Sequence, residues 1–112
     1  MRYPKFLSDT DTIGFIAPAF GCNIEPYKSA FNHGIKKLQT MGHPVKLGPN
    51  CYAGEGVGIS NKPELCAKEF MDAWCDEGNA ALFSCGGGEL MCEILPYIDF
   101  AKIKEAEPKW FM

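Results

Sequence analysis

The sequence predicts an α/β fold, in the form of a three-layer α/β/α domain around a mainly parallel sheet. Short continuous apolar runs at 12–17 and 80–85 are typical of strands buried on both faces. Stretches with helical apolar spacing follow these runs, so strand-like and helix-like segments alternate along the chain. This alternation favours a parallel sheet with helices on both faces and right-handed crossovers. The length of 112 residues suits one domain.

The first strand and the first helix have clear boundaries. The apolar run at 12–17 is ended by Pro18. A helix then opens at Asn23 or at Glu25-Pro26, since proline is tolerated in a first helical turn. Gly42 is expected to end this helix, because glycine readily adopts a left-handed conformation. The apolar face of the helix is spaced i, i+4 and i+7: Phe31, Ile35 and Leu38.

The middle of the chain predicts a strand at 44–47, a long loop at 48–60 and a second helix. Asn61 followed by Glu64 resembles a capping box, which marks the start of a helix. We expect this helix to stop at Gly78. Its apolar side carries Cys66, Phe70, Ala73 and Trp74.

The last third of the chain continues the alternation. After the strand at 80–85 come three glycines, Gly86 to Gly88, which we call the glycine turn. Short helices are predicted at 89–95 and 100–104, and a fourth strand opens at 109–112. The resulting order β-α-β-α-β-α-β describes a flavodoxin-like domain.

Composition narrows the classes of partner and the compartment. The net charge is −3 and the longest basic run is Lys36-Lys37, which argues against nucleic acid and anionic membranes as partners. No apolar stretch approaches the roughly 20 residues of a spanning helix, and the N-terminus lacks an apolar signal core, so we expect a cytoplasmic protein. The six cysteines form no C-x-x-C pair, so we expect reduced, packed thiols and no metal site.

The glycine turn is the strongest candidate for chemistry. A strand-to-helix turn at the carboxyl end of a parallel strand is where ligand sites form. Its backbone N–H groups could hold an anion or an oxyanion, or the glycines could serve only a tight connection; the spacing leaves both open. The turn fits neither a dinucleotide fingerprint nor a Walker loop.

The side chains beside the glycine turn give weaker signals. Ser84 lacks the G-x-S-x-G elbow of a nucleophile, so we interpret it as a strand-end residue. A nucleophilic Cys85 would need a base, and nothing in the sequence places His33 or His43 near it. Glu89 would lie in a first helical turn, where the dipole favours a carboxylate, and it could also bind a substrate amine.

The chain also resembles the LD-carboxypeptidase family of serine peptidases, which includes the microcin C immunity peptidases. The most specific motifs lie near its end: Gly87-Gly88, Leu95-Pro96-Tyr97-Ile98-Asp99, Ile103 and Pro108-Lys109-Trp110-Phe111. Weaker matches lie at 13–19, 41–45 and 58–73. The Leu-Pro-Tyr-Ile-Asp segment looks closer to the immunity branch than to the murein-recycling branch.

The resemblance implies a two-domain cytoplasmic hydrolase with a Ser-His-Glu triad and no metal or cofactor. Its nucleophile lies in a Gly-Tyr/His-Ser-Asp motif directly after the strand that begins at Pro108-Lys109. The sequence stops at Met112. We therefore expect residues 1–112 to be the N-terminal domain, truncated before the nucleophile and the C-terminal domain, with no catalytic residue of its own and no activity alone.

The resemblance also implies roles for a few residues of this chain. Gly87 and Gly88 match the double glycine that lines the oxyanion pocket. Substrate binding is expected at Glu89 and, after the first strand, at Pro18 and Phe20. The expected partners are a peptide-like small-molecule substrate and the C-terminal domain, with a homodimer as a candidate assembly. Glu89 differs from the Tyr of many relatives, and Gly86 stands where murein-recycling members often have Arg.

Two other functions stay open from the sequence. One is a flavodoxin-like module that holds a phosphate or nucleotide ligand at the glycine turn without catalysis. The other is a structural fragment whose apolar end, Trp110-Phe111-Met112, contacts a missing partner.

Overall fold

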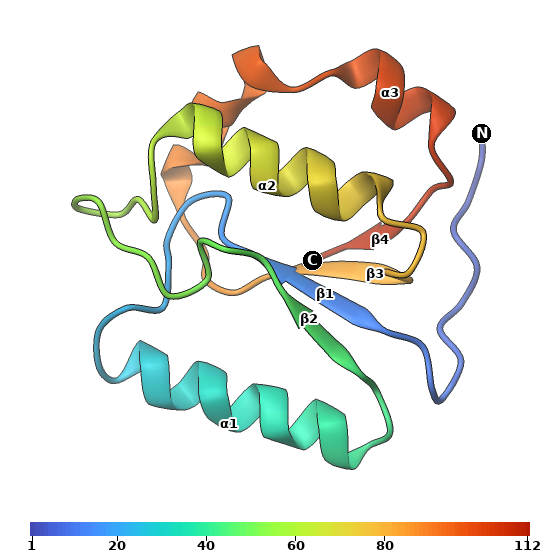
Figure 1. Ribbon diagram of the computed structural model, residues 1–112, viewed down its shortest axis with the longest axis horizontal. Helices are drawn as coiled ribbons and strands as arrows, with labels where there is room; N and C mark the ends of the chain where they lie inside the picture. Colours follow the sequence, from blue (N-terminus) through green and yellow to red (C-terminus); the bar gives the residue numbers. More distant parts are fainter.

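A computed structural model describes all 112 residues and confirms the α/β fold with a parallel sheet (Figure 1). The strands are β1 (Ile13–Ile16), β2 (Val45–Leu47), β3 (Ala81–Ser84) and β4 (Trp110–Phe111). Their order in the sheet is β2-β1-β3-β4, and every neighbouring pair is parallel. Strand β2 is added on one side of β1, and β3 and β4 are added on the other side. The strand order therefore reverses between β1 and β3.

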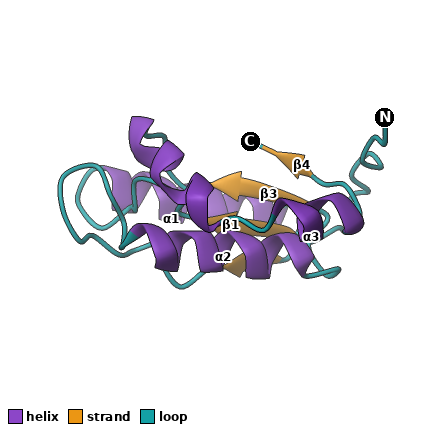
Figure 2. Cartoon of the chain, turned by 90° about the horizontal axis from the view of Figure 1, so that it is seen from above, coloured by secondary structure: helices purple, strands orange, loops and turns teal.

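Helices cover both faces of this sheet. Helix α1 (Tyr27–Thr40) lies on one face, and α2 (Pro63–Cys75) and α3 (Phe100–Glu105) lie on the other (Figure 1). A 3-10 helix, η1 (Glu89–Tyr97), packs against α2. The long loop between β2 and α2 lies at the opposite end of the molecule from the N-terminal segment (Figure 1 and Figure 2). None of the helices combines the length and the apolar character needed to cross a membrane.

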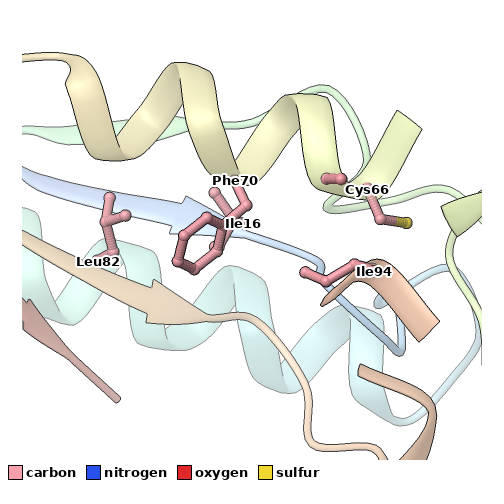
Figure 3. Close-up of a cluster of buried hydrophobic side chains, with 6 residues drawn as sticks. Ile16, Cys66, Phe70, Leu82 and Ile94 are labelled. Carbon is pink, nitrogen blue, oxygen red and sulfur yellow. The ribbon is translucent and has the colours of Figure 1, made fainter. Parts of the chain in front are cut away.

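The continuous apolar run of β1 is explained by burial on both sides. Ile13 and Phe15 pack with Phe31 of α1. Ile16 packs on the opposite face with Phe70 of α2. Figure 3 shows this second cluster, with Ile16 and Leu82 of the sheet facing α2, and Ile94 of η1 closing one end. Fully burying one such side chain stabilises the fold by roughly 1.5–3 kcal/mol.

Helix α1 ends where the sequence predicts. Gly42 adopts a left-handed φ of 102°, and its amide donates to the Gln39 carbonyl at 3.0 Å. The amide of His43 reaches back to the Leu38 carbonyl at 3.1 Å. These bonds satisfy carbonyl groups that the helix would otherwise leave unpaired.

The boundaries of α2 differ from the prediction. The N-cap is Lys62 and has no side-chain cap, so the Asn61–Glu64 capping box does not form. The Asn61 side chain instead accepts from the Lys62 amide at 2.9 Å and donates to Asn50 at 3.0 Å. The helix ends at Cys75, three residues before Gly78, because Asp76 is already extended.

The last elements are close to their predicted positions. The segment predicted as a helix at 89–95 is a 3-10 helix and continues through Pro96 to Tyr97. Helix α3 is capped by Asp99, whose side chain accepts from the Lys102 amide at 3.1 Å. Strand β4 has only two paired residues, although Met112 continues the backbone bonding to β3.

All six cysteines are free thiols. Cys22 and Cys51 belong to the core cluster beside α1, and Cys66 belongs to the cluster beneath α2. These three therefore pack as small apolar side chains, as the sequence predicts, whereas Cys75 and Cys92 are exposed.

Candidate functional site

The strand order places a candidate site at the carboxyl ends of the two inner strands, β1 and β3. Parallel strands end together, and in β1 and β3 the last residues, Ile16 and Ser84, are register partners. The chain reverses its direction of growth between these two strands. Ligands of open α/β sheets bind in the crevice at such a reversal, outside the carboxyl ends of the strands. The glycine turn meets the turn after β1, residues 17–20, at this point.

The backbone of the glycine turn keeps its donors free. The last sheet bond runs from the Cys85 amide to the Ile16 carbonyl at 2.8 Å. Beyond it, the amides of Gly86, Gly87 and Gly88 donate no hydrogen bond within the chain. The Ser84 hydroxyl donates to the Gly86 carbonyl, so this serine braces the turn as a strand-end residue. Three successive amides are thus unpaired within the chain, and two of the residues that carry them, Gly87 and Gly88, are exposed.

Two of the three glycines are required by packing. A Cβ on Gly86 would lie 2.8 Å from the Phe20 ring. A Cβ on Gly88 would lie 2.7 Å from the Ala19 methyl group, and Gly88 also has a φ of 151°. A Cβ on Gly87, by contrast, would meet no atom within 4 Å. The glycine turn is therefore both a tight connection and, at Gly87, an open surface.

The open side of the glycine turn borders a hollow of about 510 Å³. One wall is formed by Gly87 to Leu90. Phe20 and Tyr27 form an aromatic wall, with their rings edge to face at 5.1 Å. Val57 and Gly58 of the long loop complete the border, and Val57 is 98% exposed. The hollow therefore offers apolar and aromatic surface beside free amide donors.

The predicted substrate-binding residues occupy different places. Phe20 and Glu89 border the hollow together with Gly87 and Gly88. Glu89 is exposed and forms no ion pair, since the salt bridges of the chain join other residues. Pro18, which is part of the turn after β1, is buried and does not border the hollow. The structure thus brings four of the five predicted site residues together.

No acid–base pair accompanies the glycine turn. Hydrogen bonding to Cys51 and burial raise the pKa of the Cys85 thiol far above its usual range, so it is neutral and a poor nucleophile. His33 is exposed on α1. His43 precedes β2 and so lies at the amino-terminal ends of the strands, with Nδ1 2.8 Å from the Asp11 carbonyl. Nor do His, Cys, Asp and Glu side chains form any group of three that could hold a metal ion.

The structure reveals one buried charged residue that sequence reasoning missed. Glu69 of α2 is only 3% exposed. Its Oε1 accepts from the Ala17 amide, and its Oε2 accepts from the Asn50 amide, each at 2.6 Å. Burial raises the pKa of this carboxyl, while the two amide bonds act in the opposite direction. A signal existed in the sequence, because Glu69 lies three residues after Cys66 and four before Ala73, on the apolar side of its helix.

Sequence comparison connects this geometry with a known family. The family model of the LD-carboxypeptidase N-terminal domain matches residues 13–112, which include all four strands and the glycine turn. The chain belongs to the LD-carboxypeptidase family. The match confirms the family resemblance drawn from the double glycine and the Leu-Pro-Tyr-Ile-Asp segment. No curated protein matches the chain by sequence.

Solved structures of LD-carboxypeptidase relatives share the fold. The microcin self immunity protein MccF in complex with glutamyl sulfamoyl guanosine superposes with a TM-score of 0.85 at 24% identity, covering 98% of this chain and 31% of MccF. An MccF-like protein from Bacillus anthracis str. Ames gives 0.83 at 23% identity, covering 96% of this chain and 32% of its own. The MccF-like protein from Streptococcus pneumoniae, in complex with AMP, gives 0.75 at 22% identity, covering 91% and 30%. The chain thus spans about a third of the length of these proteins.

Proposed function

We propose that residues 1–112 form the oxyanion-binding N-terminal domain of a serine carboxypeptidase-like hydrolase of the LD-carboxypeptidase or microcin C immunity type. The whole enzyme would cleave an amide near the C-terminus of a peptide-like substrate in the cytoplasm. The Ser-His-Glu triad would come from polypeptide outside these residues, including the C-terminal domain. The observation that supports the proposal best is the pair of unbonded amides at Gly87 and Gly88 on the rim of the hollow.

The proposed chemistry explains why fixed amides would be useful at this position. When the serine attacks the substrate carbonyl, its oxygen becomes an oxyanion, while the histidine takes the serine proton and the glutamate orients the histidine. Amides that are already in place can donate to this charge without reorganising. One such donor is worth on the order of 3 kcal/mol of transition-state stabilisation. The packing of Gly86 and Gly88 against the turn after β1 would keep these donors in place.

The hollow suggests which part of the substrate this domain would hold. Phe20 and Tyr27 offer aromatic surface to an apolar or planar group, and Glu89 offers a carboxylate to an amine. Structures of the relative MccF have been solved in complex with aspartyl sulfamoyl adenosine and with glutamyl sulfamoyl guanosine, which join an amino acid to a nucleoside. We therefore favour an immunity-type substrate over a murein peptide.

A homodimer is the candidate assembly of the whole enzyme.

Amide NMR of this chain tests the oxyanion role directly. Aspartyl sulfamoyl adenosine serves as the probe, and we expect the Gly87 and Gly88 amide resonances to move on its addition. The Gly34 amide, on α1 and away from the site, serves as an internal control. If the Gly34 resonance moves as much as those of Gly87 and Gly88, or if none moves at millimolar probe, the oxyanion role is rejected.

A hydrolysis assay tests the absence of the triad from this chain. Incubation of residues 1–112 with the same probe, or with a murein tetrapeptide, should yield no cleavage product. Turnover comparable to that of full-length MccF would contradict the proposal, because the chain would then contain a complete reaction centre.

A phosphate- or nucleotide-binding module without catalysis is the second candidate. The same free amides could hold a phosphate, and an MccF-like relative has been crystallised with AMP. AMP and inorganic phosphate therefore form the second arm of the NMR titration. Equal shifts at Gly87 and Gly88 with AMP and with the aminoacyl probe, at equal affinity, would favour this candidate over the hydrolase.

A further inference from the structure

The turn after β1, defined as residues 17–20, lies between the glycine turn and the buried carboxylate of Glu69. We infer that Glu69 is a positioning residue that sets the place of the glycine turn by holding the turn after β1 against the loop after β2. The assignment depends on the proposed function only for what the glycine turn binds. The positioning itself follows from contacts within the chain.

Glu69 forms a pair of hydrogen bonds with backbone amides. Its two carboxylate oxygens accept from the amides of Ala17 and Asn50, both at 2.6 Å. The Ala17 amide belongs to the turn after β1, and the Asn50 amide belongs to the loop after β2. Gly48 leaves the necessary space, because a Cβ there would lie 2.4 Å from Oε2. A helix residue thus connects two separate loops.

Ser60, in the loop between β2 and α2, also holds the turn after β1 in place. The Ser60 hydroxyl donates to the Ala17 carbonyl at 2.6 Å. The Ser60 amide donates to the Ala19 carbonyl, also at 2.6 Å. Ser60 is 1% exposed, so these bonds lie out of contact with water. Glu69 and Ser60 together leave the turn after β1 little freedom to shift.

The turn after β1 packs directly against the glycine turn. The Ala19 methyl group occupies the space that a side chain on Gly88 would need, and the Phe20 ring and carbonyl occupy the space beside Gly86. The two turns are therefore in direct contact at both ends of the glycine turn. A displacement of Ala17 to Phe20 must move Gly86 and Gly88, and with them the amide of Gly87.

A carboxylate is the side chain that these contacts require. Both partners of Glu69 are N–H donors, so both side-chain atoms at this position must accept. A glutamine has one accepting oxygen and would turn its NH₂ group toward one of the two amides. Glu69→Gln therefore keeps the size of the side chain and removes one of the two bonds.

Amide NMR of variants of this chain tests the assignment. We expect Glu69→Gln to move the resonances of Gly86, Gly87 and Gly88 in addition to those of Ala17 and Asn50. Asp72→Asn makes the same carboxylate-to-amide change three residues along α2, at an exposed position, and should leave the glycine turn unchanged. Shifts confined to Ala17 and Asn50 would overturn the assignment, as would equal shifts at the glycine turn in Asp72→Asn.

A second variant covers the case in which Glu69→Gln does not fold. Ser60→Ala removes one hydroxyl from the same turn and keeps Glu69, so it perturbs the turn after β1 more gently. Its glycine-turn resonances should move as well, and unchanged resonances would overturn the assignment. No ligand enters these measurements. They therefore stand or fall separately from the probe titration that tests the oxyanion role.

Discussion

The turn after β1 and the glycine turn after β3 lie in contact at the same edge of the sheet, but their polar backbone groups have different partners. In the turn after β1, the amide of Ala17 is bonded to Glu69, and the carbonyls of Ala17 and Ala19 are bonded to Ser60. In the glycine turn, three successive amides have no partner in the chain. Buried polar groups are normally paired, so the first turn has the properties of a scaffold and the second those of a binding surface.

The two turns are also held by different forces. Hydrogen bonds to side chains from distant parts of the chain fix the turn after β1. Close steric contact with Ala19 and Phe20 fixes the glycine turn. A backbone amide without a partner can therefore be held rigidly, because the backbone around it packs against a neighbouring turn whose own polar groups are hydrogen-bonded.

Removal of the Glu69 carboxylate should have the largest effect on stability. Glu69→Ala leaves the amides of Ala17 and Asn50 buried without an acceptor. Each unsatisfied donor costs about 1–3 kcal/mol, so we expect a loss of about 3 kcal/mol in the free energy of unfolding. Urea denaturation followed by circular dichroism measures this loss. Asp72→Asn, an exposed change on the same helix, should stay within about 0.5 kcal/mol of the unmodified chain, and equal losses would remove the basis of the comparison.

A side chain on Gly88 should have the next largest effect. In Gly88→Ala the new methyl group meets the Ala19 methyl group, and the φ of 151° is unfavourable for any residue with a Cβ. We expect a loss of about 2 kcal/mol, in the range of a strained backbone position. The same denaturation experiment measures it. A fully stable Gly88→Ala variant would show that the two turns are not in close contact.

A side chain on Gly87 should affect binding and not stability. Gly87→Ala meets no atom within 4 Å, so the free energy of unfolding should change by less than about 0.5 kcal/mol. The methyl group borders the hollow, so we expect about tenfold weaker binding of aspartyl sulfamoyl adenosine, equivalent to about 1.4 kcal/mol. Isothermal titration calorimetry measures the affinity. Gly34→Ala, another glycine with open surroundings, should leave binding unchanged, and an unaffected Gly87→Ala would place the ligand elsewhere.

The smallest effect should be a pH dependence that belongs to Glu69. Burial raises the pKa of its carboxyl in the folded state, so folding favours the protonated form. The resulting stability is present below the unfolded pKa of about 4.3 and is lost as the pH rises through the folded pKa. The free energy of unfolding of the unmodified chain, minus that of Glu69→Gln, should therefore fall as the pH increases above this value.

Subtracting the free energy of unfolding of Glu69→Gln from that of the unmodified chain leaves the contribution of Glu69 and cancels those of the other carboxylates. Asp11, Glu25 and Asp76 have lowered pKa values through hydrogen bonds, and they act in the opposite direction in both proteins. Lys46, Asp72 and Asp76 line the surface cavity that borders Glu69 and are likewise present in both. Urea denaturation at a series of pH values gives the difference, and a rise with pH would contradict the assigned direction.

The sequence by itself determined the elements that depend on near neighbours. The continuous apolar run of β1 predicted a strand buried on both faces, and Gly42 predicted the end of α1, because both signals act within a few residues. The three glycines between a strand and a helix predicted a candidate site at this turn, and Phe20, Gly87, Gly88 and Glu89 border one hollow there. Pro18 of the turn after β1, also predicted to bind substrate, is buried instead.

Only the tertiary structure decided which polar groups are paired and which are free. Glu69 bonds to residues 52 and 19 positions away, and nothing near it in the sequence identifies these partners. The same holds for Asn61, whose side chain bonds to Asn50 instead of capping α2. A hydrogen-bond partner is chosen by proximity in space, and proximity between distant segments exists only once the sheet has brought their loops to one edge.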